Sequence, residues 1–322
     1  MNTLDRLAQQ RPTTADLDAA WAPADRADVL DTILATPDTA PPVTFRPRRR
    51  VLIGVGVVAA ALAVGLPLAV PRNAPGGATP AAAAELAVLA QVASKAPYDD
   101  IRPGQFLHVI ERTHMERNVD WDHPDHITVA TSTSESWIAT DGTLWRKDTL
   151  LASNDRTPPL PAPDVMRFRA GGAWLNYPSP SYLAGLPTDP DRLDAYLRRH
   201  VSGSTSTDEA VFVAIGDFLR GGFAPRALRV AAIEVLQRNP HVDLGTTTTD
   251  ALGRPVAEFV FVDEHARPGT VASLRFSTAT AEIVEEVTLQ DGTPVNTTTQ
   301  QSMDVVDAVP AAILRNAKRA DD

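Results

Sequence analysis

Residues 51–70 (VLIGVGVVAAALAVGLPLAV) constrain this chain most, because they contain no charged side chain and no strongly hydrogen-bonding one. At a rise of about 1.5 Å per residue, a helix of this length is roughly 30 Å long, which matches the hydrocarbon core of a bilayer. A backbone in lipid must satisfy its own hydrogen bonds, so we expect a helix here despite three glycines. The sequence therefore predicts a single transmembrane helix at residues 51–70.

The charges beside this segment predict its orientation. Four arginines (Arg46, Arg48, Arg49 and Arg50) precede it, whereas only Arg72 follows closely. The positive-inside rule then places residues 1–50 in the cytoplasm and residues 71–322 outside the membrane. An alternative is an export signal, because residues 48–53 (RRRVLI) resemble a twin-arginine signal and residues 82–84 (AAA) could be cleaved. The fifty residues before the apolar run favour a retained anchor.

Residues 1–50 form a short cytoplasmic arm with seven acidic and seven basic residues. Val29, Leu30, Ile33 and Leu34 place an apolar stripe on a helix over about residues 25–35. That stripe is too small to bury an independent core, so we expect an arm that is mostly disordered apart from this short helix. Two interpretations stay open: a tail with transient helix, or a segment that folds on a cytoplasmic partner.

Residues 71–80 (PRNAPGGATP) have the composition of a linker, and residues 81–322 predict one extracytoplasmic α+β domain. Asp141-Gly142 and Asp291-Gly292 lie between alternating runs, a pattern typical of hairpins and hence of an antiparallel sheet. Helices grouped between the strands form a helical insertion at residues 188–238. The expected strands are 105–113, 128–140, 143–149, 165–169, 242–249, 255–262, 271–277, 282–290 and 293–303; the expected helices are 81–95, one beginning near 189, 207–220 and 225–238.

Composition and motifs exclude several classes of chemistry. The chain has no cysteine, which removes disulfides, thiolate zinc sites, iron–sulfur clusters and cysteine nucleophiles. A formal charge of −10 argues against nucleic acid as a partner, because a phosphate backbone requires clustered Lys and Arg. The chain contains neither a phosphate-binding glycine motif nor a Gly-x-Ser-x-Gly elbow. We therefore expect no catalytic residues, no cofactor and no enzyme activity.

Residues 120–126 (DWDHPDH) could offer three carboxylates and two imidazoles to a divalent ion. Their spacing matches no known metal-binding loop, and Pro124 suits a turn, so we expect a solvated acidic loop and no metal site. His108 and His114 are six residues apart in a predicted strand and are expected to be packed or surface side chains. Asn296-Thr297-Thr298 matches a glycosylation sequon, a pattern that often arises by chance.

Four motifs carry a resemblance to a known family: residues 102–109 (RPGQFLHV), 186–193 (LPTDPDRL), 250–257 (DALGRPVA) and 305–309 (VVDAV). With the arm, arginine cluster, single span and alanine-rich helix, they resemble a family of single-pass membrane proteins from high-GC Gram-positive bacteria. Members often accompany extracytoplasmic-function sigma factors. The resemblance implies an outer domain similar to the lipoprotein-carrier half-barrel, a curved antiparallel sheet with helices against its concave face. These motifs are structural, so no functional residue is carried over.

This chain departs from the family pattern at residues 277–281 (STATA), where members usually have an Asp-Pro…Thr-Gly turn. The geometry of that hairpin stays open.

Two functions remain. In the first, a membrane-spanning regulator senses a signal outside and holds a sigma factor with its arm. In the second, the outer domain is a tethered lipid- or lipoprotein-binding module of the cell envelope. We expect the large side chains of the helical insertion to close on the sheet as a solid core; a cavity there would favour the lipid. The candidates to face the sheet are Phe212, Phe218, Phe223, Leu228 and Ile233.

Overall fold

The computed structural model describes residues 77–95, 101–118, 127–155, 159–169 and 178–319. The chain divides into two units, Met1–Leu68 and Ala69–Asp322, and every described residue belongs to the second. Among these residues, no helix combines the length and apolar character that crossing a membrane requires. The predicted membrane segment at residues 51–70 and the arm at residues 1–50 lie outside the described part of the chain.

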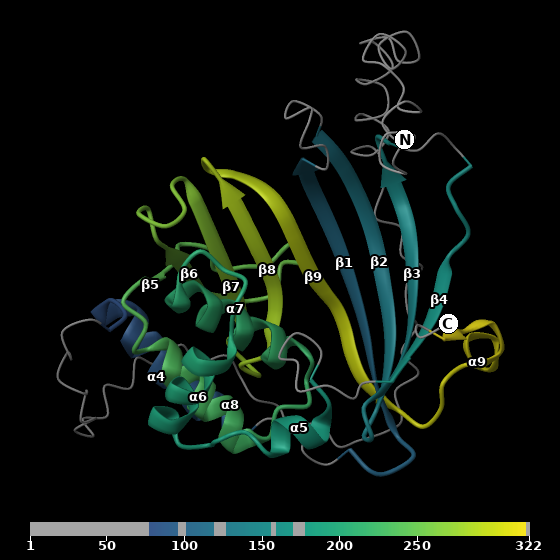
Figure 1. Cartoon of the computed structure of the whole chain (residues 1–322), viewed down its shortest axis with the longest axis horizontal. Helices are drawn as coiled ribbons and strands as arrows, with labels where there is room; N and C mark the ends of the chain where they lie inside the picture. Colours follow the sequence, from purple (N-terminus) through teal and green to yellow (C-terminus); the bar gives the residue numbers. More distant parts are fainter. Residues whose placement is uncertain (1–76, 96–100, 119–126, 156–158, 170–177, 320–322) are drawn as a thin grey trace, which may run out of the picture. The chain divides into compact units, whose positions relative to one another are not determined.

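The described residues form an α+β domain around one ten-stranded open sheet (Figure 1). Its order is β10-β4-β3-β2-β1-β9-β8-β7-β6-β5, and every neighbouring pair is antiparallel except β10 with β4. The predicted antiparallel sheet is thus confirmed. The strands are β1 (Phe106–Asn118), β2 (Ile127–Ala139), β3 (Thr143–Ser153), β4 (Asp164–Arg169), β5 (Val242–Leu244), β6 (Val256–Val262), β7 (Thr270–Ser277), β8 (Ile283–Gln290), β9 (Thr293–Val306) and β10 (Lys318–Arg319).

The helices fall mostly between β4 and β5, which confirms the helical insertion. They are α4 (Pro80–Ala93), α5 (Pro180–Ala184), α6 (Pro190–His200), α7 (Thr207–Arg220), α8 (Arg226–Leu236) and α9 (Ala311–Asn316). Local sequence explains where α6 and α7 begin. The Asp189 carboxylate accepts from the Arg192 amide at 3.0 Å, and the Ser206 hydroxyl accepts from the Glu209 amide at 3.1 Å. Each cap satisfies an amide that would otherwise have no partner in the first helical turn.

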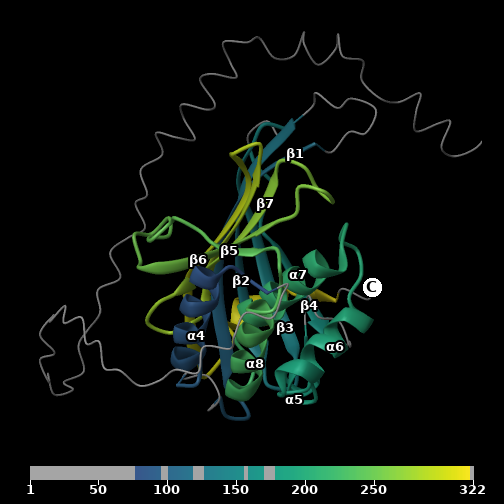
Figure 2. The same cartoon turned by 90° about the vertical axis from the view of Figure 1, so that its left-hand side faces the viewer.

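Helices α4, α6, α7 and α8 pack on one side of the sheet, which we call the inner face (Figures 1 and 2). Their core takes its strand residues from β5 to β8 and, within the described chain, none from β1 to β4. A smaller apolar cluster lies on the opposite, outer face. There, α9 covers Trp137 of β2, which is 3% exposed, together with the half-buried Trp145 of β3.

Some element boundaries differ from the predictions. The strand predicted at residues 242–249 ends at Leu244. The following residues keep only scattered backbone contacts toward β6, such as the Gly245 amide to the Glu258 carbonyl and an isolated Thr249–Pro255 bridge. Helix α4 begins at Pro80, inside the predicted linker, since proline suits the first helical turn. Strands β1, β3 and β9 run past their predicted ends. The sequence analysis did not anticipate the two short helices α5 and α9 or the two-residue β10.

The turn at residues 277–281, whose geometry the sequence did not predict, is held by hydrogen bonds to Ser277. The Ser277 carbonyl accepts from the Ala281 amide at 2.8 Å, and its hydroxyl accepts from the amides of Ala279 and Thr280, each at 3.3 Å. Ala281 takes the left-handed conformation, with φ of 55°. Serine therefore supplies the hydrogen bonds of the turn, while an alanine adopts the conformation that glycine prefers.

Candidate functional site

The end of helix α7 lies directly on the centre of the sheet. Gly222, just after the helix, has φ of 71°, and a Cβ there would lie 2.7 Å from both Leu107 Cδ2 and Met303 Sδ. Leu107 belongs to β1 and is fully buried, and Met303 belongs to β9. Gly216, six residues earlier on the helix, is also close: its Cβ would lie 3.0 Å from Leu274 Cδ2 and 3.2 Å from Glu286 Oε1. Two glycines thus allow α7 to approach the inner face closely.

Four charged side chains meet at this contact: Arg220 and Asp217 of α7, Glu111 of β1 and Glu286 of β8. We call them the Arg220 cluster. The Arg220 guanidinium bonds to the Glu286 carboxylate and donates to Asp217 at 3.2 Å, and its Nε lies 3.6 Å from Glu111. Each of the four side chains is only 21–23% exposed. One cation therefore faces three carboxylates, which leaves two excess negative charges when all are ionised.

Burial of the cluster raises the pKa values of two of its carboxyl groups. Burial raises the pKa of Glu286 to about 7; Arg220 lowers this pKa, and the negative charges of Asp217 and Glu111 raise it further. Burial likewise raises the pKa of Asp217 to about 6, against the lowering effect of Arg220. Both carboxyls also lie near the carboxyl end of α7, where the helix dipole disfavours negative charge. The Arg220 cluster therefore titrates near neutral pH.

Beyond this contact, the inner face of β1, β2 and β3 is polar in its middle part, while Leu107, Val109 and Leu144 lie at one end of it. The Arg146 guanidinium of β3 donates to the Asp148 carboxylate and to the Ser134 hydroxyl of β2, each at 2.8 Å. The Ser134 hydroxyl in turn donates to Asp148 at 2.5 Å. Alternation along the paired strands places five more small or charged side chains on the same face: Glu111, Thr113, Ser132, Ser136 and Thr298. This stretch of the sheet offers hydrogen bonds and charges rather than an apolar surface.

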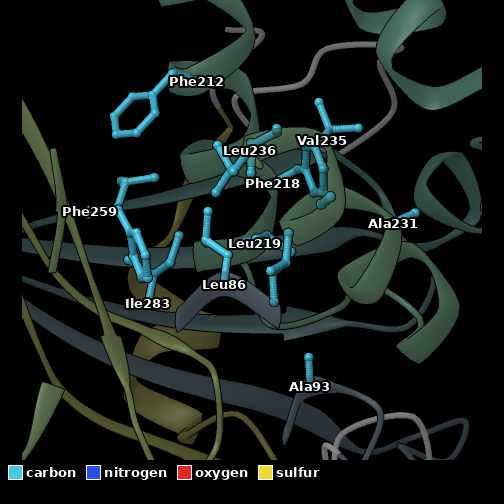
Figure 3. Close-up of a cluster of buried hydrophobic side chains, with 14 of the residues drawn as sticks. Leu86, Ala93, Phe212, Phe218, Leu219, Ala231, Val235, Leu236, Phe259 and Ile283 are labelled. Carbon is cyan, nitrogen blue, oxygen red and sulfur yellow. The ribbon is translucent and has the colours of Figure 1, made fainter. Parts of the chain in front are cut away.

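The covered half of the inner face is a closed apolar core. Phe212, Phe218, Leu228 and Ile233 are each at most 1% exposed, as predicted, whereas Phe223 is only partly buried at its edge. Figure 3 shows side chains of α4, α7 and α8 in one cluster with Phe259 and Ile283 of the sheet. Phe212 meets Phe261 of β6, with ring centroids 5.4 Å apart, which confirms that it faces the sheet. The orientation of Phe218, Phe223, Leu228 and Ile233 toward the strands stays a prediction.

The outer face carries a buried ion network beneath residues 245–255. Arg275 of β7 donates to Glu258 of β6 at 2.9 Å and also bonds to Glu285 of β8. Glu285 is fully buried and Glu258 is 8% exposed. Burial opposes the ionisation of Glu258, but hydrogen bonds from Thr247, Arg275 and Ser273 outweigh it, so the pKa of Glu258 is lowered.

The motif at residues 250–257 explains how that segment is held. Asp250 accepts from the Leu252 amide at 2.9 Å and from the Arg254 amide at 2.8 Å, and it also pairs with the Arg254 guanidinium. Arg254 then donates to the Gln300 carbonyl of β9 at 2.6 Å, and the Ala251 amide donates to Glu285 at 3.0 Å. The motif thus connects β6 to β8 and β9 by hydrogen bonds. This agrees with the expectation that its residues serve the structure rather than a reaction.

The other residues singled out by the sequence are not brought together. His108 stacks on Trp137 with ring centroids 4.9 Å apart and lies 3.1 Å from Glu135, and His114 contacts the Thr131 hydroxyl at 3.1 Å. Asn296 lies inside the central strand β9, paired with Met115 and Thr288, a poor setting for glycosylation. Residues 120–126 lie outside the described part of the chain. Among the described residues, no group of three His, Cys, Asp or Glu residues is suited to hold a metal.

The Arg220 cluster was not predicted from the sequence. Only Asp217 and Arg220, three positions apart on a helix, form a visible pair in the sequence. Glu111 and Glu286 join them only through the pairing of β1 and β8 on either side of β9. No local pattern carries that information.

No protein-family model matches this chain, and no curated protein sequence is similar to it. Among solved structures, it is similar to a chain of the Pseudomonas aeruginosa MucA/MucB complex, with a TM-score of 0.30 and 12% identity over 74% of this chain and 61% of that one. It is similar to a crystal structure of MucB, with a TM-score of 0.32 and 13% identity over 76% and 65%.

The third similar structure is an outer membrane lipoprotein-sorting protein domain from Vibrio parahaemolyticus, with a TM-score of 0.21 and 9% identity over 73% of this chain and 98% of that one. This chain spans less than two thirds of the length of the first two matched chains. At such low scores, the function has to be argued from this chain's own residues.

Proposed function

We propose that this chain is a membrane-anchored, non-enzymatic protein of the cell envelope, with a sensing or binding domain outside and a regulatory arm inside. The anchor is residues 51–70, and the arginines at positions 46–50 hold residues 1–50 in the cytoplasm. The described α+β domain is then extracytoplasmic. The arm acts on a sigma factor, as the family resemblance implies, and folds on that partner because it is too short to bury a core alone.

The polar inner face of β1, β2 and β3 is the observation that favours this proposal over a lipid carrier. An acyl chain requires a continuous apolar surface, because burying unpaired hydroxyls and carboxylates beside it costs free energy. Ser134, Arg146 and Asp148 instead present a hydrogen-bonded charged surface. The half of the sheet that is apolar is already filled by α4, α7 and α8. The outer domain accordingly senses through contacts with protein surfaces.

The arm is tested by a pull-down. A peptide of residues 1–50, immobilised and exposed to cytoplasmic extract, is expected to retain a sigma factor. A matched peptide with Leu30→Asp and Ile33→Asp should lose it, because these changes interrupt the apolar stripe. A control peptide with Asp38→Asn, outside the expected helix, should bind as before. Equal recovery on all three peptides, or no sigma factor on any, would contradict the proposal.

The topology is tested in cells whose wall has been removed. Added protease is expected to digest residues 71–322 and to leave an amino-terminal fragment protected. The opposite pattern, or a mature chain beginning near Ala84, would refute a retained anchor. Replacing the arginines at positions 46, 48, 49 and 50 with glutamate should scramble the orientation, because the orienting charge would be lost.

The lipid-binding alternative retains one supporting observation. At one end of the inner face, Leu107, Val109 and Leu144 form an apolar strip on β1 and β3, each at most 8% exposed. Native mass spectrometry of the full chain purified from its own envelope separates the two functions. We expect no bound lipid; a reproducible added mass that organic extraction removes would favour the tethered lipid- or lipoprotein-binding module.

A further inference from the structure

We propose that the Arg220 cluster is a pH-sensitive latch: it holds the carboxyl end of α7 on the sheet in acid and releases it as the pH rises. The latch is a property of the described domain, so it depends neither on the membrane anchor nor on the identity of a partner. Its two sides are Asp217 and Arg220 on the helix, and Glu111 and Glu286 on the sheet. Among the described residues, the ion pairs of Arg220 join these two sides, so the cluster reports on whether α7 is docked.

Charge imbalance makes the docked state depend on protons. Arg220 can neutralise one carboxylate, and the remaining two repel each other where all four side chains are mostly buried. Protonation of one or two carboxyls removes that repulsion and supplies O–H donors to the remaining carboxylate. When α7 lifts, the carboxyls are exposed to water and ionise at their ordinary pKa. Docking and proton binding therefore favour each other.

Among the described residues, one further cation lies on this face: Arg146 of β3 donates to Ser134, which pairs with Glu111, and also to Asp148. The charged groups that act on Glu286 are Arg220, Asp217 and Glu111, in that order. Beside them, β9 contributes the neutral Thr298 and Gln300, and β7 contributes Leu274, whose side chain would lie 3.0 Å from a Cβ at Gly216. The pKa of Glu286 is about 7 against an ordinary 4.5, and that of Asp217 is about 6 against 3.8, so the transition falls near neutral pH.

Release of the latch would uncover apolar surface at a defined place. Gly222 lies against Leu107 and Met303, so lifting the end of α7 exposes these two side chains next to the polar inner face of β1 to β3. Phe218 and Leu219 lie between Asp217 and Arg220 and are 0% and 7% exposed, so release also draws these two side chains out of the core between α7 and β5–β8. The change therefore extends over residues 216–223 and alters the surface presented to a partner.

Hydrogen exchange followed by mass spectrometry tests this latch in the full chain in detergent micelles. Protection of residues 216–223 is compared at about pH 5 and about pH 8, after correction for the intrinsic exchange rate. Each unit of pH across the titration window raises the release equilibrium constant by up to about tenfold. We expect residues 216–223 to lose at least about tenfold in protection, while α8 is unchanged.

Three variants decide the cause. Asp217→Asn with Glu286→Gln mimics the protonated pair, so residues 216–223 should stay protected at about pH 8. Asp304→Asn removes an exposed carboxylate of β9 outside the cluster and should behave like the unchanged chain. Arg220→Gln leaves three carboxylates without their cation and should move release to lower pH.

The latch is refuted if the unchanged chain is equally protected at both pH values. It is also refuted if the Asp217→Asn, Glu286→Gln variant loses as much protection as the unchanged chain. If the double variant does not fold, the Arg220→Gln variant provides the test. The proposal is contradicted if residues 216–223 of this variant lose protection at the same pH as in the unchanged chain, or at a higher one.

Discussion

Replacing Arg275 with methionine tests whether the outer-face network is held by charge compensation. The change leaves the Glu258 and Glu285 carboxylates buried without their cation, while methionine keeps most of the apolar volume of the arginine stem. Breaking a buried ion pair on one side costs about 3–5 kcal/mol. Glu258 keeps Ser273 and Thr247 as donors, and Glu285 keeps Ala251 and Thr299. We therefore expect the lower end, a loss of about 3 kcal/mol in the free energy of unfolding.

Urea denaturation of the full chain in detergent, followed by tryptophan fluorescence, measures this loss. The compensating variant Arg275→Met, Glu258→Gln, Glu285→Gln removes all three charges and should recover to within about 1–2 kcal/mol of the unchanged chain, because no buried charge is then unpaired. The loss in Arg275→Met should also shrink as the pH falls, since the stranded carboxylates take up protons. The reasoning fails if the single variant loses less than about 1 kcal/mol, or if the triple variant is no more stable than the single one.

Three further predictions use the same denaturation measurement. Phe218→Ala should cost about 3–5 kcal/mol because it empties a fully buried site, whereas Val213→Ala, 42% exposed on the same helix, should change stability by less than about 0.5 kcal/mol. Gly222→Ala should cost more than Gly253→Ala: both have positive φ, but only Gly222 is crowded, so equal losses would contradict the close contact with Leu107. The free energy of unfolding should fall as pH rises from about 4.5 to about 7, because Glu286 ionises in the unfolded chain first; Glu286→Gln should flatten this slope, and an unchanged slope would argue against the raised pKa.

Local signals in the sequence predicted the elements that depend on local chemistry. Helix α7 was predicted at residues 207–220, as observed, because an apolar face is followed by two glycines; in the structure Ser206 caps its amino end. The Asp291-Gly292 turn was predicted because both residues tolerate positive φ, and they have φ of 51° and 79°. In each case the physical cause lies within a few residues of its effect.

The elements that were mispredicted depend on distant partners. Residues 245–249 have the composition of a strand, yet the Thr247 amide bonds to the Glu258 side chain and Gly245 lies against it. The segment therefore keeps only scattered backbone contacts with residues 255–258 while it covers buried charges that belong to other strands. The Arg220 cluster was missed for the same reason, since its members come from positions 111, 217, 220 and 286. Side-chain type alone does not predict which strands become neighbours.

The pairing of β1 with β9 has a consequence for how the protein is made. Phe106 pairs with Val306, so a strand synthesised early waits for one of the last strands before its second edge is satisfied. Until then the β1–β4 meander has an unpaired edge along β1, where a strand of another unfinished chain can bind. Contacts between such distant positions also slow folding, because a long loop must close first. Biosynthesis of this protein therefore depends on keeping nascent chains apart until β9 (Thr293–Val306) has emerged.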